Sequence, residues 1–339
     1  MIDSADPADS YYEDMRPGDF LVMTTVFIDG EAGTTGLQIR ERLAGRSDVS
    51  LLAIDADKRK DDETRREMLN AADIAILCLP DAAAREAVAM IDNPATRVID
   101  ASTAHRTAPD WVYGFAEMTP DQVKKIAEAR FIANPGCYPQ GLIALVRPLI
   151  TAGILPADHP VVYSAVSGYS GGGRQMIEAY EAAGADANPF MPYGLTFAHK
   201  HLPEMAYYSG LSRDPLFQPA VGNYAQGMLG TVPVFLGDLA KPVTGANLAV
   251  CLADYFGDDG FVTVVPYEPT ERAADLDPQA LNGSNGMRLH VFANDERGQA
   301  LLVVIYDNLG KGASGAAVQN LNIMIGADQT AGLDLPIAA

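Results

Sequence analysis

The chain has 339 residues, 48% of them hydrophobic, so it is long enough to bury two separate cores. Its formal net charge of −20 opposes binding to nucleic acid or to an anionic membrane surface, and no stretch approaches the roughly 20 apolar residues of a membrane helix. Three cysteines in no metal-ligand spacing argue against a disulfide framework and indicate a reducing, cytoplasmic compartment. The acidic residues 1–22 lack the features of a secretory signal, and we expect a disordered extension there.

The next part of the chain alternates β-branched apolar runs with helical patterns. The expected strands cover residues 21–29, 49–55, 73–80, 96–102 and 130–134. The expected helices cover residues 37–43, 61–70, 81–91 and 119–129. This alternation predicts an α/β fold with a parallel, doubly wound sheet of the Rossmann type, whose ligands bind at the carboxyl ends of the strands.

Three glycines, Gly30, Gly33 and Gly36, follow the first expected strand and open the first helix. A pyrophosphate needs such a tight turn, a close approach of the backbone and a helix N-terminus. The spacing GxxGxxG is less specific than GxGxxG, so a glycine-rich turn without a ligand is the alternative.

The second expected strand ends at Asp55, and a basic run of Lys58, Arg59 and Lys60 follows it. An acidic residue here would accept a hydrogen bond from a ribose 2′-OH, whereas a basic residue would bind a 2′-phosphate. The basic run favours NADP(H) as the cofactor, and a solvated run of charges is the alternative.

Cys137 stands between an Asn-Pro-Gly turn and an apolar helical pattern, in the stretch IANPGCYPQG. A helix N-terminus stabilises a thiolate and lowers the pKa of the thiol, so this position predicts a reactive nucleophile. The alternative is a small buried side chain, which is our interpretation of Cys78 and Cys251 in their apolar runs.

A cysteine nucleophile needs a partner for proton transfer, and the segment AHKHLPEM supplies His199 and His201. Two histidines at i and i+2 could also bind zinc, but no further ligands accompany them, and we expect no metal. Anion binding is expected of Arg106, in DASTAHR, and of Arg174, in SGYSGGGR, because a guanidinium group binds carboxylate or phosphate bidentately.

Four motifs, in the order NPGCYPQG, SGYSGGGR, HKHLPEM and GKGASGAAVQN, resemble those of N-acetyl-γ-glutamyl-phosphate reductases. The resemblance covers residues 26–326, and DASTAHR is similar to the shorter of two sequence types in this family. It implies that Cys137 attacks the acyl phosphate of N-acetyl-L-γ-glutamyl phosphate and forms a thioester. NADPH would reduce the thioester to N-acetyl-L-glutamate 5-semialdehyde, as a step of arginine biosynthesis.

The resemblance also implies roles for the site residues. His201 is the expected acid/base, with His199 in reserve. Substrate binding is expected of Ser102, Arg106, Asn134, Gln140 and Arg174. Cofactor binding is expected of Gly30, Gly33, Thr34, Thr35, Gly36, Cys78, Leu79, Pro80, Ser170, Gly171, Gly312, Ser314 and Gly315.

The family layout implies an NADP-binding Rossmann domain of residues 23–136 plus 310–339, and a catalytic and dimerising α+β domain of residues 137–309. Alternating apolar residues on both sides of residues 295–298 predict a β-hairpin in the second domain. A homodimer or homotetramer is expected. Two alternatives stay open: a reductase of a related acyl phosphate, of lysine-pathway or aspartate-semialdehyde type, and a catalytically silent dinucleotide-binding protein.

Overall fold

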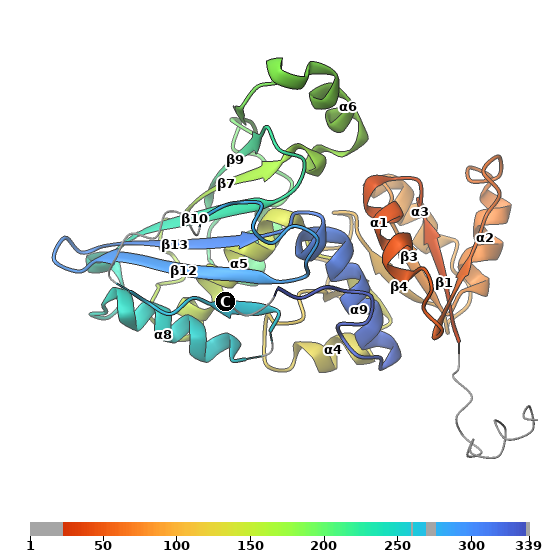
Figure 1. Cartoon of the computed structure of the whole chain (residues 1–339). Helices are drawn as coiled ribbons and strands as arrows, with labels where there is room; N and C mark the ends of the chain where they lie inside the picture. Colours follow the sequence, from red (N-terminus) through yellow and green to blue (C-terminus); the bar gives the residue numbers. More distant parts are fainter. Residues whose placement is uncertain (1–22, 259, 269–275, 337–339) are drawn as a thin grey trace, which may run out of the picture.

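Two sheets organise the molecule (Figure 1). The structure is a computed structural model that describes residues 23–258, 260–268 and 276–336, so the extension expected at 1–22 lies outside the described residues. No helix in these described ranges is long and apolar enough to cross a membrane.

The first sheet has six strands, all parallel, in the order β2-β1-β3-β4-β6-β5. The strands are β1 (Thr24–Asp29), β2 (Val49–Leu52), β3 (Ile74–Leu77), β4 (Arg97–Asp100), β5 (Val112–Tyr113) and β6 (Phe131–Ala133). Five of them fall within the predicted runs. β5 was not predicted, because a strand of two residues is too short to show a periodic pattern.

Helices cover both faces of this sheet, as a doubly wound fold requires. Successive residues of a strand point to opposite faces, so Val26 and Ile28 enter one core and Phe27 enters the other. The first core is closed by α1 (Thr34–Leu43), α4 (Gln122–Glu128) and α9 (Gly315–Ile325). The second core is closed by α2 (Asp62–Ala71) and α3 (Asp81–Ala89). The predicted Rossmann-type architecture is confirmed.

The second sheet has seven strands of mixed direction, in the order β11-β12-β13-β10-β7-β9-β8. The strands are β7 (Val162–Gly168), β8 (Phe190–Pro192), β9 (Leu216–Gly222), β10 (Met228–Phe235), β11 (Val262–Val264), β12 (Met287–Asn294) and β13 (Gln299–Tyr306). β12 and β13 pair antiparallel from Met287–Tyr306 to Asn294–Gln299, which confirms the predicted hairpin.

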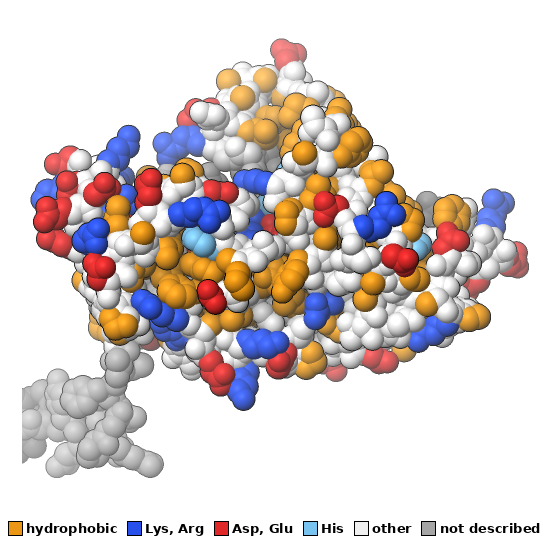
Figure 2. Space-filling view, turned by 180° about the vertical axis from the view of Figure 1, so that it is seen from behind, with side chains coloured by type: hydrophobic (Ala, Val, Ile, Leu, Met, Phe, Trp, Pro, Cys, Tyr) orange, Lys and Arg blue, Asp and Glu red, His pale blue; other side chains and the backbone are white. Residues whose placement is uncertain are grey.

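Helices cover only one face of the second sheet. The helices on that face are α5 (Cys137–Thr151), α7 (Leu202–Ser209) and α8 (Gly245–Phe256). The helix α6 (Gly173–Ala183) belongs to a lobe that rises above the rest of the molecule (Figure 1). Figure 2 shows hydrophobic side chains on the surface of this upper lobe.

Because α5, α7 and α8 all lie on one face of the second sheet, no helix of the described residues covers its opposite face in the single chain.

Candidate active site

Cys137 is the first residue of α5 and lies at the carboxyl edge of the first sheet. The strand β6 ends at Ala133, and the backbone N–H of Asn134 donates to the carbonyl of Asp100 at 2.8 Å, so the ladder with β4 extends one residue further. The carbonyl of Asn134 then accepts from Nε of Arg106 at 3.0 Å. These bonds fix the turn that delivers the cysteine to the start of the helix.

A cavity of about 300 Å³ lies beside Cys137. Side chains and backbone from α5, the end of β7, the SGYSGGGR loop and the HKH segment form its wall. The lining residues are Cys137, Tyr138, Ser167, Gly168, Gly171, Gly172, Met176, Tyr193, His199, Lys200, His201 and Val221. The predicted nucleophile and both predicted histidines thus share one cavity.

His201 belongs to a buried cluster that packs against Gly136, the residue before Cys137. Its Nδ1 lies 2.7 Å from Oε1 of Glu204, and the same oxygen accepts from Nη1 of Arg106 at 2.7 Å. The other oxygen, Oε2, accepts from the Tyr113 hydroxyl at 2.8 Å and from the backbone N–H of Gly136 at 3.1 Å. Nδ1 of His201 also lies 3.0 Å from Nη1 of Arg106, a group that only donates. Because a carboxylate only accepts and its contact with Nδ1 is the shorter one, we assign the proton to Nδ1, which leaves Nε2 as the acceptor.

Gly136 has no space for a side chain. A Cβ there would lie 2.6 Å from Nη1 of Arg106, 2.6 Å from Cε1 of His201 and 2.7 Å from Oε1 of Glu204. The glycine of the Pro-Gly-Cys sequence is therefore required by the cluster that packs against it.

The protonation states of the cluster follow from its burial and its charges. Burial raises the pKa of Glu204, but the Arg106 charge and the hydrogen bonds from His201 and Gly136 outweigh it and lower that pKa to about 2. Burial lowers the pKa of His201, and burial together with the charges of His201 and Lys200 lowers the pKa of His199 to about 4. Both imidazoles are therefore neutral at pH 7 and able to accept a proton.

The thiol of Cys137 differs from the prediction made from its helix position. Part of its surface is exposed to the cavity, but protein atoms surround the sulfur, and this burial raises its pKa above the ordinary value of 9.0. The charge of Arg106, the backbone N–H of Tyr138 and the charge of Lys200 act in the opposite direction without reversing the shift. The expectation of a lowered pKa is wrong, because the effect of desolvation is larger than the effects of the helix N-terminus and the nearby cations.

All five residues predicted to bind substrate form hydrogen bonds within the protein, and Nη2 of Arg174 donates to the carbonyl of Ala32 at 2.6 Å. The Ser102 hydroxyl donates to Asp100 at 2.7 Å, and the Gln140 amide donates to the Lys311 carbonyl at 2.6 Å. The Asn134 amide donates to the carbonyl of Ala313 at 3.0 Å. Arg106 lies in the cluster described above. Their assignment to the substrate stays a prediction.

The glycine turn after β1 has the shape that a pyrophosphate requires. Gly30 adopts φ +87°, and a Cβ there would lie 2.4 Å from the carbonyl oxygen of Cys78. Gly33 is the N-cap of α1, with Thr34 and Thr35 as its first residues, so the free N–H groups of the helix face the turn. The strand β3 ends beside it, at Cys78, Leu79 and Pro80, and Pro80 is the N-cap of α3. These predicted cofactor residues are therefore adjacent.

The other predicted cofactor residues lie nearer to Cys137. Gly171 lines the cavity, and the Ser170 hydroxyl accepts from Asn308 at 3.0 Å. A Cβ on Gly312 would lie 3.1 Å from Cβ of Cys137, within the π-helical turn Gly310–Ser314. That turn also reaches the first helix, because the Ser314 hydroxyl donates to Gln38 at 2.8 Å.

Comparison with known proteins connects this geometry to a family. The model of the semialdehyde dehydrogenase NAD binding domain matches residues 25–126, and that of the semialdehyde dehydrogenase dimerisation domain matches residues 137–308. An N-acetyl-gamma-glutamyl-phosphate reductase of Mesorhizobium japonicum is 59% identical over 303 residues, which are 89% of this chain and 98% of that protein. The chain belongs to the N-acetyl-gamma-glutamyl-phosphate reductase family.

Other relatives and solved structures agree with this family and its fold. A reductase of the same name from Burkholderia lata is 58% identical over 91% of this chain and 98% of its own length. The crystal structure of aspartate semialdehyde dehydrogenase II from Vibrio cholerae, complexed with ASA, has a TM-score of 0.66 at 16% identity and covers 90% of this chain and 98% of that one. An aspartate semialdehyde dehydrogenase with NADP from Candida albicans has a TM-score of 0.58 at 14% identity over 89% and 98% of the two chains.

Three site residues were not assigned a role from the sequence. Glu204 follows His201 by three residues, and this helical spacing could have indicated their contact. Lys200 lies between the two histidines and lines the cavity with them. Tyr113 reaches Glu204 from the unpredicted strand β5, and no local sequence signal indicated it.

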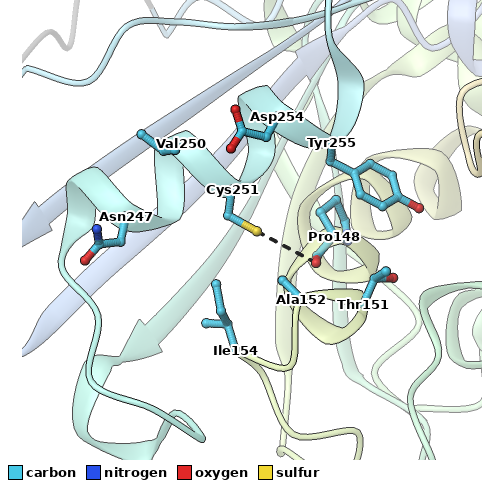
Figure 3. A pocket seen from close by; sticks show the side chains of 9 residues that line it. All are labelled: Pro148, Thr151, Ala152, Ile154, Asn247, Val250, Cys251, Asp254 and Tyr255. Carbon is cyan, nitrogen blue, oxygen red and sulfur yellow. Dashed lines mark hydrogen bonds between the residues drawn. The ribbon is translucent and has the colours of Figure 1, made fainter.

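A second cavity, of about 450 Å³, lies between α5 and α8 and contains Cys251 (Figure 3). The thiol of Cys251 points to the carbonyl oxygen of Pro148 at 3.8 Å, and the wall of this cavity includes Asp254 but no histidine, lysine or arginine. Burial raises the pKa of Cys251, and Asp254 raises it further. Within the part of the chain that the structure describes, Cys251 thus shares its cavity with no histidine, whereas Cys137 shares its cavity with two.

Proposed function

We propose that this chain catalyses the NADPH-dependent reduction of N-acetyl-L-γ-glutamyl phosphate to N-acetyl-L-glutamate 5-semialdehyde and phosphate, in arginine biosynthesis. The observation that carries the proposal is the position of Cys137 at the start of α5, in one cavity with His199 and His201. Family membership supports the same reaction.

In the first half of the reaction, Cys137 is the nucleophile. Nε2 of His201 takes the thiol proton, which is necessary because burial holds the thiol in its protonated form. The sulfur bonds to the acyl carbon, the carbon–oxygen bond to the phosphoryl group breaks, and phosphate leaves with the proton. The acyl group remains on Cys137 as a thioester.

In the second half, the protein orients the acyl group and transfers the proton that the reduction requires. Bound NADPH supplies the hydride. After phosphate has left, His201 takes a proton from solvent and gives it to the carbonyl oxygen of the Cys137-bound acyl group as the hydride arrives. When the aldehyde leaves, His201 takes this proton back from the hydroxyl group and returns it to the sulfur of Cys137. Glu204 keeps the imidazole oriented throughout, through the bond at Nδ1.

The cofactor site is proposed at the turn of Gly30, Gly33 and Gly36, together with the start of α1 and the residues 78–80 that follow β3. NADP(H) rather than NAD(H) is supported by two arginines at this turn. Nη2 of Arg59 lies 2.8 Å from Glu31, and Nη1 of Arg40 lies 3.2 Å from the same carboxylate, which directly follows Gly30. We assign the 2′-phosphate to these two arginines.

The functional unit is proposed to be a homodimer or homotetramer. The open face of the second sheet forms a cavity of about 390 Å³ with Phe190, Leu195 and Phe197, and each of these three side chains is more than half exposed. A sheet face this apolar needs a partner, and a second copy of the same face fits it. We also propose the boundaries 136/137 and 309/310 between the two domains, and a cytoplasmic location.

A related acyl phosphate, of lysine-pathway or aspartate-semialdehyde type, is the second candidate substrate. The aspartate semialdehyde dehydrogenases share the fold at 13–16% identity, and a likeness at this level supports the architecture alone. Turnover with each semialdehyde distinguishes the candidates.

The test is the reverse reaction: phosphate-dependent reduction of NADP⁺ by N-acetylglutamate semialdehyde. We expect activity in the wild type and a loss of several orders of magnitude in Cys137→Ser. Cys251→Ser is the matched control and should retain activity, because Cys251 lies in the separate cavity. Activity that survives Cys137→Ser would exclude the thioester mechanism, and a wild type that binds NADP⁺ without turning over any semialdehyde would identify a silent binding protein.

A further inference from the structure

The cavity beside Cys137 has an unusual charge balance for an enzyme of an anionic substrate. The whole chain carries −20, so an acyl phosphate that also has a carboxylate is repelled at long range. The wall of the cavity must therefore supply positive charge locally. Among the residues that the structure describes, Lys200 is the one lysine or arginine on that wall.

The two arginines predicted to bind the substrate are engaged elsewhere. Arg106 is 7% exposed, and its guanidinium donates to the Asn134 carbonyl, to Glu204 and, at 3.0 Å, to the carbonyl of residue 101. Nη2 of Arg174 donates at 2.6 Å to the carbonyl of Ala32, in the glycine turn of the first domain. Neither is among the residues that line the cavity.

Lys200 is free to bind an anion. It is exposed, and within residues 23–258, 260–268 and 276–336 its ammonium forms no hydrogen bond or ion pair. The imidazoles on either side of it are neutral at pH 7, since the pKa of each is lowered by burial. Its positive charge acts on Cys137 and on Asp81 at the start of α3: it opposes the rise that burial causes in the pKa of Cys137, and it contributes to the lowered pKa of Asp81. Lys200 is therefore close to the nucleophile and to the edge of the first sheet.

We propose that Lys200 binds the phosphoryl group of the acyl phosphate and stabilises it as it leaves. The inference rests on the function proposed above. The phosphoryl group is bonded, through one oxygen, to the carbon that Cys137 attacks, so its binding group must share the cavity with the thiol. The carboxylate of the substrate is several bonds more distant. An ammonium is a compact point charge, which suits a group that departs from the site better than a bidentate fork would.

The reverse reaction tests this assignment, because phosphate and semialdehyde then enter as separate substrates. The variants are Lys200→Met, which keeps the length of the side chain without the charge, and Lys200→Arg, which keeps the charge. Lys124→Met is the matched control, since Lys124 is an exposed lysine on α4. We expect Lys200→Met to raise the KM for inorganic phosphate about tenfold or more, which corresponds to the loss of one charged contact. The KM for the semialdehyde should change less than about twofold, and Lys200→Arg should restore most of the phosphate affinity.

The contrary results are distinct. A rise confined to the KM for the semialdehyde would assign Lys200 to the carboxylate and overturn the proposal. An equal rise of both constants, or no change in either, would also overturn it. These outcomes require an active wild type, so inactivity would count against the proposed function and not against the site.

A binding measurement then decides the site without turnover. Inorganic phosphate should slow the alkylation of Cys137 by iodoacetamide in the wild type and in Lys124→Met. The protection, taken as the ratio of rates without and with phosphate in each protein, should vanish in Lys200→Met. Undiminished protection in Lys200→Met would overturn the assignment of the phosphoryl group to Lys200.

Discussion

Nδ1 of His201 lies 2.7 Å from Oε1 of Glu204, one helical turn further along the chain. Through its second oxygen the same carboxylate accepts from the backbone N–H of Gly136, the residue before the nucleophile. Glu204 therefore joins His201, the proposed acid/base, to the turn that carries Cys137, and the relative position of these two residues depends on it.

The first prediction concerns Glu204→Gln. An amide cannot accept equally from all four of its partners, so the imidazole loses its fixed orientation, and we expect kcat to fall about 10²-fold or more. Burial lowers the pKa of His201, and the hydrogen bond that its imidazole donates to Glu204 acts in the opposite direction. The loss of this bond should therefore lower the pKa further and move the acid limb of the kcat–pH profile to lower pH. Steady-state kinetics of the reverse reaction between pH 5 and 9 measure both effects. Glu128→Gln, at an exposed position of α4, is the control and should behave as the wild type. An unshifted acid limb would mean that Glu204 has only a structural role.

The second prediction compares two glycine variants. Gly136→Ala places a methyl group within 2.7 Å of Arg106, His201 and Glu204, so the cluster must move, and we expect kcat to fall about 10²-fold with the fold retained. Gly237→Ala is the matched control, because a Cβ there meets no atom within 4 Å and its φ is not in the left-handed region. Circular dichroism checks the fold. Full activity in Gly136→Ala would show that the cluster can shift without catalytic cost.

The third prediction concerns the pH dependence of Cys137. Burial raises the pKa of this thiol above its ordinary value of 9.0, so the thiolate fraction is small at neutral pH and increases as the pH approaches and passes that value. We expect the rate at which iodoacetamide alkylates Cys137 to rise continuously up to pH 9 without a plateau. Peptide mapping of the alkylated residue, with Cys137→Ser as the blank, measures it. A plateau below pH 8 would indicate a lowered pKa and a preformed thiolate.

The fourth prediction concerns a buried ion pair outside the cavity. Nζ of Lys311 lies 2.7 Å from Glu117, and the two side chains are 1% and 3% exposed. Lys311→Met leaves an uncompensated buried carboxylate, and we expect the free energy of unfolding to fall by about 3–5 kcal/mol. The double variant with Glu117→Gln should recover part of this loss, since the phenyl rings of Phe115 and Phe261 surround the end of the Lys311 side chain and accept an apolar replacement.

Urea unfolding followed by circular dichroism measures these differences. Lys124→Met, which breaks an exposed pair at 4.0 Å, should change the stability by less than about 0.5 kcal/mol. A double variant that is less stable than Lys311→Met would show that the carboxylate is satisfied without the lysine.

Much of the architecture follows from local patterns in the chain. The alternation of strands and helices up to Asn134 gives the doubly wound sheet, because parallel strands buried on both faces are continuous apolar runs. The β12–β13 hairpin follows from alternating apolar residues around a polar turn. The position of Cys137 at a helix start is equally local, since it depends on the preceding Asn-Pro-Gly turn.

The contacts that complete the site join residues that are far apart in the chain. Gly136 and Glu204 are separated by 68 residues, Ala32 and Arg174 by 142, and Glu117 and Lys311 by 194. No local sequence pattern predicts which distant side chain will contact which backbone group. The pKa of Cys137 is a result of the same kind, because the burial that raises it exists only when both domains are packed around the thiol.

The sequence by itself therefore determined the family and the α/β architecture, and it predicted Cys137 as the nucleophile with two candidate histidines, since each depends on residue types at short spacing. Only the tertiary structure decided that Glu204 contacts His201, that Arg174 reaches the glycine turn, and that Lys200 lines the same cavity as Cys137. The physical reason is that hydrogen bonds and charges act over a few ångströms in space, whatever the separation of the residues along the chain.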